Sequence, residues 1–393
     1  MLDFLDTRFP VMLDLTTVGN KTLLNYKLKL LFFINANFSN FKYFLFNMNV
    51  DKVLLATPRG FCAGVEKAIK ALAWMLKIFP PPVYCYHEIV HNQFVVETFK
   101  KNGVIFVDDV NDVPAFAPLM LSAHGTAPTV EDQARLNFRI VINAVCPLVT
   151  KVHHEVKIRS KKGFSIIYVG HSGHEEAVGT MAVAPESVYL VETPEDLDNI
   201  PISNDSPTAL LAQTTLSQDE WKDILDKAII KFPDLWMPNR GDLCFATTNR
   251  QDALADISHL SDTVIVVGSA NSSNTVALTK VATARGAKNV IRVNSADEIP
   301  DDLYGTVGVT AGASAPDELI FKVIEKLNPK FGYQEVGKVV EDEYFPPPPE
   351  LRELIKATAK AMTAGIAFRT EITSPLDSDR DLSASSSLNL LKV

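Results

Sequence analysis

The sequence predicts an α/β protein of three similar lobes in a pseudo-threefold (trefoil) arrangement. One unit recurs nine times along the chain: a short β-branched apolar run, a polar or glycine-rich loop, and an amphipathic helix. This alternation is typical of parallel βαβ units whose helices cover a buried sheet. The units divide into three groups of three, and each group opens with one of three distant cysteines, Cys62, Cys146 and Cys244.

Each group contributes three predicted strands. In chain order, the expected strands are Val53–Ala56, Pro82–Tyr86, Leu119–Ser122, Arg139–Asn143, Ser165–Val169, Ala209–Ala212, Asp242–Phe245, Thr263–Val267 and Val307–Val309. Amphipathic stretches follow several of these runs, for example at Val65–Lys77, Thr129–Leu136 and Asp317–Leu327. Their helical spacing of apolar residues predicts helices that pack on the sheets.

The cysteines divide the chain at similar intervals. Cys62 and Cys146 are 84 positions apart, and Cys146 and Cys244 are 98 positions apart. This similarity indicates three related lobes, which we expect at residues 48–142, 143–240 and 241–335, followed by a C-terminal segment at residues 336–355.

The two ends of the chain do not follow this pattern. Residues 1–47 are rich in Leu, Phe and Asn, and we expect a non-native or disordered extension there, with Met48 as an alternative start. Pro346–Pro349 breaks any regular element, and Asp377–Ser387 is a polar run rich in Ser and Asp. Such a run buries too little apolar surface to fold, so we expect a disordered tail at residues 356–393.

Composition excludes several classes of function. The formal net charge is −9 and no block of Lys or Arg could follow a nucleic acid backbone, so nucleic acid is not expected as a partner. The apolar run at residues 28–46 contains Lys29, Lys42 and several Asn, which makes it a poor membrane span; a weak membrane-surface anchor is the alternative. No signal-peptide pattern opens the chain, so we expect a cytoplasmic protein without a membrane partner.

The loops that follow the strands carry the polar chemistry. Parallel α/β sheets bind ligands beyond the carboxyl ends of their strands, so three facing lobes would bring their loops into one central cavity. In chain order these loops read PRGFCAG, HEIVHN, SAHGTAP, NAVCP, GHSGHEE, AQTTLS, CFATTN, GSANSSN and GASAPDE. Each places a small polar residue, an imidazole or a thiol at a strand end, and few carry a charge.

The cysteines are candidate metal ligands. Four cysteines are too few and too scattered for a disulfide framework, and three thiolates from separate lobes suit a soft metal centre. Structural zinc usually shows paired ligands at C-x₂₋₄-C spacing, which is absent here, but ferredoxin-type clusters also use clustered cysteines. Spacing alone therefore leaves both metals open. Cys85 lies within the strand run VYCYHE, and we expect it to be structural.

Several loop residues predict an anion site. Ser272, Asn274 and Ser314 stand where helices begin, and backbone N–H groups there favour phosphate. Histidines in three other loops can donate hydrogen bonds or carry charge: His91, His124 and His174. Taken singly, such a serine is more often a helix N-cap and such a histidine is more often structural. Their recurrence at equivalent loop positions favours a shared site.

One carboxylate is a candidate for proton transfer. Glu176 follows His174 in a glycine-rich loop, and a carboxylate beside a dry site can have a raised pKa. Thr214, in the next loop, could hydrogen-bond both this carboxylate and a substrate hydroxyl. The alternative is that Glu175 and Glu176 are simply first-turn acids of the following helix.

In order and spacing, these segments resemble the motifs of the 4-hydroxy-3-methylbut-2-enyl diphosphate reductase family. The resemblance rests on PRGFCAGVEKA, HEIVHN, SAHGTAP, NAVCPLVTKVH, GHSGHEE, AQTTLS, CFATTNRQDA, VGSANSSN and VTAGASAPD, and it covers roughly residues 50–355. It implies a three-lobed α/β trefoil around a central [4Fe–4S] iron–sulfur cluster. One departure is Glu175, since the family more often has Pro or another small residue between the His and the Glu.

The resemblance also implies an activity and residue roles. Two electrons and two protons would remove the allylic hydroxyl of a diphosphate substrate, giving isopentenyl and dimethylallyl diphosphate in the last step of the methylerythritol phosphate route. Carried over by motif, the three cysteines bind the cluster, Thr214 positions the hydroxyl and Glu176 delivers the proton. The residues that bind the diphosphate would be His91, His124, His174, Ser272, Ser273, Asn274 and Ser314. A ferredoxin- or flavodoxin-type partner would supply electrons, because no dinucleotide-binding fingerprint occurs.

Two rival functions stay open at this point. In a zinc-dependent hydrolase, Cys and His would bind the metal and Glu176 would activate water. In a non-enzymatic iron–sulfur sensor, the same cysteines would hold a cluster, but the His and Ser loops would have no role.

Overall fold

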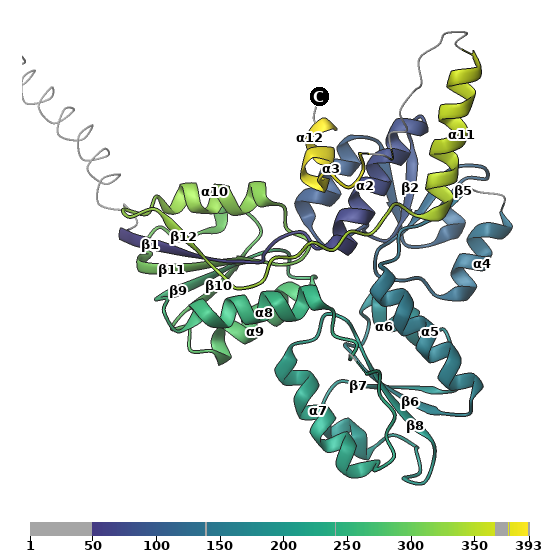
Figure 1. Ribbon diagram of the computed structural model, residues 1–393, viewed down its shortest axis with the longest axis horizontal. Coiled ribbons are helices and arrows are strands. Elements are labelled where there is room, and N and C mark those ends of the chain that lie inside the picture. The colour runs from purple at the N-terminus through teal and green to yellow at the C-terminus, as the bar shows by residue number, and fades with distance from the viewer. Residues whose placement is uncertain (1–48, 138–139, 240, 366–375, 377, 392–393) are drawn as a thin grey trace, which may run out of the picture. The chain divides into compact units, whose positions relative to one another are not determined.

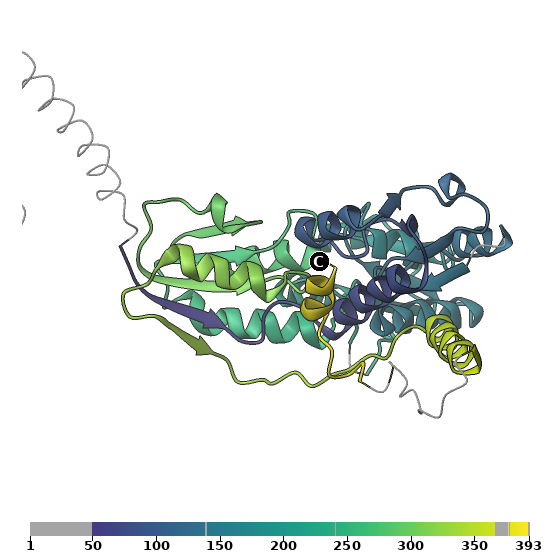
Figure 2. The ribbon, with the colours of Figure 1, turned by 90° about the horizontal axis from the view of Figure 1, so that it is seen from above.

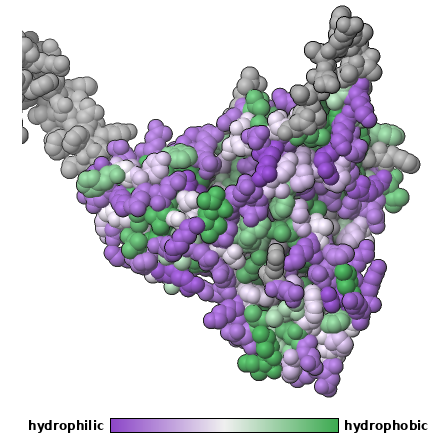
Figure 3. All heavy atoms as spheres, viewed as in Figure 1, coloured by the Kyte–Doolittle hydropathy of each residue, from purple (hydrophilic) through white to green (hydrophobic). Residues whose placement is uncertain are grey.

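The strands form three separate sheets (Figure 1). The structure is a computed structural model that describes residues 49–137, 140–239, 241–365, 376 and 378–391. The expected extension at residues 1–47 lies outside this part of the chain. None of the helices in the described residues is both long enough and apolar enough to span a membrane. On the face drawn in Figure 3, hydrophilic side chains dominate and apolar ones gather in patches.

The first sheet has the strand order β3-β2-β4-β5, and all its pairs are parallel. Its strands are Val83–Tyr86 (β2), Val104–Val107 (β3), Pro118–Leu121 (β4) and Ile140–Asn143 (β5). The associated helices are Gln93–Lys101 (α3) and Pro128–Leu136 (α4). Helix Ala63–Ile78 (α2) belongs to the same hydrophobic core, which also contains Cys85.

The second sheet has the order β7-β6-β8 and is also parallel. Its strands are Ser165–Val169 (β6), Val188–Val191 (β7) and Thr208–Ala212 (β8), and its helices are Pro147–Lys161 (α5), Glu175–Met181 (α6) and Gln218–Lys231 (α7). Strand β8 is buried along its whole length, as expected for an apolar strand with both faces covered.

The third sheet has the order β10-β9-β11-β1-β12. Its strands are Asn49–Ala56 (β1), Thr263–Val267 (β9), Val290–Val293 (β10), Tyr304–Ala311 (β11) and Tyr333–Val336 (β12). Its helices are Phe245–Ser258 (α8), Ser273–Ala284 (α9) and Asp317–Leu327 (α10).

One strand order recurs in all three sheets. The first strand along the chain is central, the second lies at the edge, and the third pairs on the other side, giving β3-β2-β4, β7-β6-β8 and β10-β9-β11. A helix joins the first two strands, and a short 3₁₀ helix precedes the third, at Val110–Asp112, Pro194–Asp198 and Ala296–Glu298. The predicted three-lobed α/β fold is therefore confirmed.

A fourth segment beside the third strand leads to each cysteine. Strand β5 pairs with β4 and precedes Cys146, while a short parallel bridge of Trp236 to Ala209 in β8 precedes Cys244. In the third lobe this place is taken by β1, which lies beside β11 and precedes Cys62. Strand β1 therefore belongs to the third lobe, although it precedes the first lobe in the sequence.

This arrangement corrects two predictions. The strand at Val53–Ala56 does not open the lobe expected at residues 48–142, because its Leu54 and Ala56 pack in the core of the third sheet. The strand expected at Asp242–Phe245 is wrong, since helix α8 begins at Phe245 with Cys244 as its N-cap. Chain order does not reveal which sheet edge a strand will fill. Four short edge strands were also missed, namely β3, β7, β10 and β12.

The C-terminal part of the chain is more ordered than expected. Residues 337–348 run without helix or strand from β12 to helix Pro349–Gly365 (α11), as Figures 1 and 2 show. Helix Ala384–Leu390 (α12) packs on α2. The sequence also permits one helix over residues 352–366, which α11 matches, while the prediction of a disordered tail is wrong for residues 356–365 and for α12. The reason is a helical spacing of apolar residues, Ala384, Leu388 and Leu391, which all enter the core around α2.

A buried ion pair anchors this C-terminal segment to α2. Lys70 Nζ lies 3.1 Å from Asp379 Oδ2 and donates to the Asp379 carbonyl at 2.8 Å. The two side chains are 4% and 0% exposed. Tyr344 donates its hydroxyl to the same carboxylate at 2.8 Å, so Asp379 joins three segments of the chain.

We expect Asp379→Ala to destabilise the protein by about 3–5 kcal/mol, because it leaves the Lys70 charge buried without its partner. Urea unfolding at pH 7 measures the change. Asp381→Ala is the matched control, since Asp381 is exposed and its substitution should change stability by less than about 0.5 kcal/mol. Equal effects of the two substitutions would contradict a structural role for the buried pair.

Candidate active site

A single cavity receives loops from all three lobes. The volume of this cavity is about 100 Å³. All the residues predicted for the site line it: Cys62, Cys146, Cys244, His91, His124, His174, Glu176, Thr214, Ser272, Ser273, Asn274 and Ser314. Cys85 does not line it and is fully buried in strand β2.

The three cysteines occupy equivalent positions. Each is the N-cap of a helix: Cys62 of α2, Cys146 of α5 and Cys244 of α8. Each donates its backbone N–H to a carbonyl in the loop after the third strand of a lobe. The acceptors are Ala313 at 3.2 Å, Ala123 at 3.0 Å and Thr214 at 3.1 Å. The same local geometry therefore delivers all three thiols to the cavity.

The environment of these thiols favours their thiolate form only if a positively charged group, such as a metal centre, binds beside them. Burial, and then the neighbouring Cys62, raises the pKa of Cys146 to about 12 and that of Cys244 to about 11. Thr247 lies near the Cys244 sulfur, with Oγ1 at 3.0 Å and its N–H donating at 3.3 Å. A bound metal centre would stabilise the thiolates that burial alone disfavours.

The spacing of the thiols distinguishes between metals. Three thiolates on one zinc ion would lie ~3.8 Å apart, given Zn–S bonds of about 2.3 Å. Among the described residues, the group whose ligand atoms all lie within 4.8 Å is His91, His124 and Glu175, and the cysteines form no such group. Gly64 keeps space between two of them, because a Cβ there would be 2.7 Å from the Cys146 sulfur and 3.9 Å from the Cys62 sulfur. The donor set fits a larger, multinuclear centre better than one ion.

Three histidines line another part of the cavity. The rings of His91 and His124 are stacked, with centroids 3.9 Å apart and planes at 10°. His174 meets both edge-on, at 5.6 and 6.2 Å. Burial lowers the pKa of His174 to about 4 and holds that of His124 well below its usual value, with the neighbouring histidines adding to both shifts. A bound anion would oppose these shifts.

The neighbouring polar residues Ser272, Asn274 and Ser314 line the same cavity. Ser272 caps α9 by accepting from the Thr275 N–H, so the N-cap alternative holds for it. Asn274 accepts from the Ala313 N–H at 3.0 Å, which leaves its buried Nδ2 without a partner among the described residues. Ser314 donates to the His91 carbonyl at 2.8 Å. Unpaired donors at a helix N-terminus favour an anion.

Glu176 and Thr214 form a buried pair. Glu176 accepts from the Thr214 N–H at 2.8 Å and from the Thr214 hydroxyl at 3.0 Å, and its side chain is almost fully buried. Burial raises the pKa of Glu176 to about 7, against the opposing effect of both Thr214 hydrogen bonds. Glu175 does not line the cavity. Both glutamates do lie in the first turn of α6. The alternative that they are simply first-turn acids of this helix is therefore also compatible with the geometry.

Comparison with known proteins shows the family to which the chain belongs. A family model described as LytB protein matches residues 53–328. The chain belongs to the LytB protein family. It is 44% identical over 316 residues to 4-hydroxy-3-methylbut-2-enyl diphosphate reductase of Streptomyces avermitilis, covering 79% of this chain and 94% of that protein. The reductase of the same name from Tropheryma whipplei is 46% identical over 308 residues, covering 77% of this chain and 98% of that protein.

Solved structures agree with this assignment. The E-1-hydroxy-2-methyl-but-2-enyl-4-diphosphate reductase of Plasmodium falciparum superposes with a TM-score of 0.75 at 34% identity, covering 79% of this chain and 99% of that one. A second LytB-like structure, titled (E)-4-hydroxy-3-methyl-but-2-enyl diphosphate reductase, gives a TM-score of 0.53 at 26% identity.

Three contributors to the site were missed from the sequence. Gln213 is fully buried and donates to both Thr215 and Ser273, at 2.9 and 3.0 Å. The buried guanidinium of Arg250 donates to the Gly60 carbonyl, close to Cys62. Phe345 reaches the cavity from outside the LytB match. The first two stand within recognised motifs, which was an available signal, whereas nothing in the sequence pointed to Phe345.

The raised pKa of Glu176 predicts a pH-dependent stability. Because the folded state holds this proton up to about pH 7 and the unfolded chain only to about 4.5, stability should fall as pH rises between those values, by roughly 3 kcal/mol at most. We expect Glu176→Gln to flatten this part of the profile in chemical denaturation. Glu186→Gln at an exposed position is the control and should keep the wild-type slope.

Proposed function

We propose that this chain reduces (E)-4-hydroxy-3-methylbut-2-enyl diphosphate to isopentenyl diphosphate and dimethylallyl diphosphate, the last step of the methylerythritol phosphate route. Two electrons and two protons enter, the allylic C–O bond breaks, and the hydroxyl leaves as water. The observation that carries this proposal is one cavity that combines three convergent thiols, the buried carboxyl group of Glu176, and ring and amide nitrogens of His124 and Asn274 that have no partner among the described residues. The 4-hydroxy-3-methylbut-2-enyl diphosphate reductases that this chain resembles support it.

A [4Fe–4S] cluster is the proposed cofactor, held by Cys62, Cys146 and Cys244. The equivalent N-cap positions, the buried thiols and the space beside Gly64 support this assignment. When bound, such a cluster supplies electrons and a Lewis-acidic iron.

The diphosphate is proposed to bind at the donor-rich part of the cavity. His91, His124 and His174 would donate ring N–H groups, and Asn274 would donate its free Nδ2. Ser272, Ser273 and Ser314 lie at or near the N-termini of α9 and α10, whose backbone N–H groups favour phosphate oxygens. With the diphosphate held there, the allylic end of a short substrate would face the thiols.

Glu176 is proposed as the proton donor, with Thr214 as its link to the substrate hydroxyl. A carboxyl whose pKa lies near 7 is partly protonated at neutral pH, so it can donate and then be recharged from solvent. The Thr214 backbone N–H fixes one carboxyl oxygen, and the Thr214 hydroxyl contacts the other. Donor and relay are therefore oriented before substrate arrives.

The electrons are proposed to come from a ferredoxin- or flavodoxin-type protein in the cytoplasm, since the sequence has no dinucleotide-binding fingerprint. The rival zinc hydrolase fits less well, because the thiols are spread more widely than one zinc ion requires. The rival iron–sulfur sensor would leave the buried donors of Asn274 and His124 without a role.

Glu176→Gln should keep substrate binding and lose about 10²–10⁴-fold in single-turnover rate, because it removes general-acid catalysis. Rapid quench of the anaerobic protein with a chemical reductant measures this. In the wild type, the rate should fall as pH rises above about 7, where Glu176 loses its proton. A wild-type rate in Glu176→Gln would move the proton-donor role to another group.

Iron and sulfide analysis after anaerobic reconstitution tests the cofactor. Cys146→Ser should lose most of the iron and the brown absorbance, because it removes one ligand. Cys85→Ser is the matched control and should retain both, since Cys85 is fully buried in strand β2 away from the cavity. A colourless, zinc-containing wild-type protein would falsify the cluster assignment, and iron loss in Cys85→Ser would mean that the ligand trio is wrong.

A further inference from the structure

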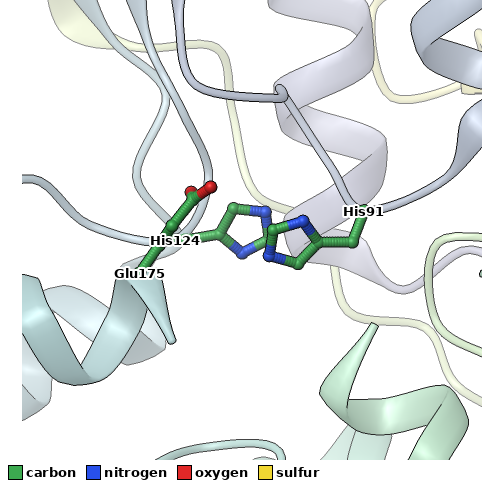
Figure 4. Close-up of side chains that lie close together, drawn as sticks. All are labelled: His91, His124 and Glu175. Atoms are coloured by element: carbon green, nitrogen blue, oxygen red, sulfur yellow. The ribbon is translucent and has the colours of Figure 1, made fainter. Parts of the chain in front are cut away.

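Glu175 lies directly behind the cavity wall that carries the histidines. It is the first residue of α6, next to Glu176, yet its carboxylate does not enter the cavity. Instead, one of its oxygens lies within 4.8 Å of ring nitrogens of both His91 and His124. Figure 4 shows the carboxylate beside His124, whose ring overlaps that of His91. Ser122 donates to the same carboxylate at 3.4 Å.

This group of three is poorly built to hold a metal ion. A metal bound by two imidazoles lies about 2.0–2.1 Å from each nitrogen, in the plane of each ring. The rings of His91 and His124 are nearly parallel and 3.9 Å apart, so their nitrogen lone pairs run side by side and do not converge. The proximity of Glu175 therefore needs another explanation.

A second carboxylate supports the same pair. Glu88 Oε2 lies 3.4 Å from His91 Nδ1 and is itself held by the Asn271 amide at 2.9 Å. Glu88 and Glu175 thus both lie close to ring nitrogens of the stacked pair. The other titratable groups that act on the pair or on these carboxylates are His87, His174, Lys100, Asp108, Cys85 and Tyr86.

A positive charge on the stacked His91–His124 pair is unfavourable, and a nearby carboxylate can stabilise it. Two stacked imidazoles in a buried wall disfavour a shared positive charge, and the pKa of His124 is held low by burial and by His91. A diphosphate, however, is bound best by donors that carry charge. Burial raises the pKa of Glu175, whereas His91 and His87 oppose that rise, so the carboxylate and the imidazoles stabilise each other's charge.

We propose that Glu175 is a positioning residue of the diphosphate subsite, which fixes the stacked His91–His124 pair from behind and enables it to take up a proton as the diphosphate binds. The inference rests on the proposed function, because it concerns the same subsite. It adds a residue that touches neither the substrate nor the cluster, and it predicts that binding of the anion is coupled to proton uptake.

Calorimetric titration of inorganic pyrophosphate into the reconstituted protein, between pH 6.5 and 8.5, tests this inference. Titrations in buffers of different ionisation enthalpy measure the number of protons taken up, and we expect the wild type to take up protons when pyrophosphate binds. Glu175→Gln should bind about tenfold more weakly at pH 6.5, which corresponds to a shift of about one pH unit in the proton uptake, and nearly normally at pH 8.5, where neither protein takes up the proton. KM should rise in parallel while kcat stays within about twofold. Glu175→Asp should recover part of the affinity.

Glu186→Gln is the matched control, an exposed glutamate of the same lobe that should keep wild-type binding at every pH. Iron content and thermal melting establish that each variant is folded. Wild-type affinity and proton uptake in Glu175→Gln would overturn the inference, as would an equal loss of affinity at all pH values, which would indicate a purely structural role. A wild type that binds no pyrophosphate would instead overturn the proposed function.

Discussion

The rest of the structure depends on burying three thiols from three lobes in one small cavity. Burial, and then the neighbouring Cys62, raises the pKa of Cys146 and of Cys244, so the fold must hold these thiols in place against both burial and repulsion between thiolates. It does so with one device used three times: each cysteine caps a helix and donates its N–H to the loop after a neighbouring strand. The lobes are alike in that each holds one cysteine at the cavity by the same local geometry.

Connections between lobes keep this arrangement from opening. Arg250, fully buried on α8, donates to the Gly60 and Phe61 carbonyls beside Cys62 and pairs with Glu341 of the C-terminal segment. That segment contributes Phe345 to the cavity and is secured through Tyr344 and Asp379. Buried charges of this kind tolerate little displacement, because an unpaired guanidinium or ammonium would remain in the interior. The wall of the site is therefore tied to the stability of the chain end.

The distribution of charge around the cavity fits an anionic substrate and a proton-dependent reaction. Glu88 lies 3.4 Å from His91, and a Glu175 oxygen lies within 4.8 Å of ring nitrogens of His91 and His124, yet neither of these carboxylates lines the cavity. Glu176 is the carboxyl group that does enter, and burial raises its pKa to about 7, so it is partly protonated at neutral pH. These adjacent glutamates of one helical turn have different surroundings, because consecutive side chains on a helix point about 100° apart.

The sequence by itself determined the three-lobed α/β class, the cysteine trio and the loop residues of the site, because strand-end loops of parallel sheets converge by topology alone. It did not determine that β1 completes the third sheet, since pairing at a sheet edge depends on which lobe leaves that edge free. Nor did it reveal the order of α12, whose apolar residues gain stability only by packing on α2. The different surroundings of Glu175 and Glu176, and the raised pKa of Glu176, depend on burial and on hydrogen-bond partners from distant segments, which only the tertiary structure supplies.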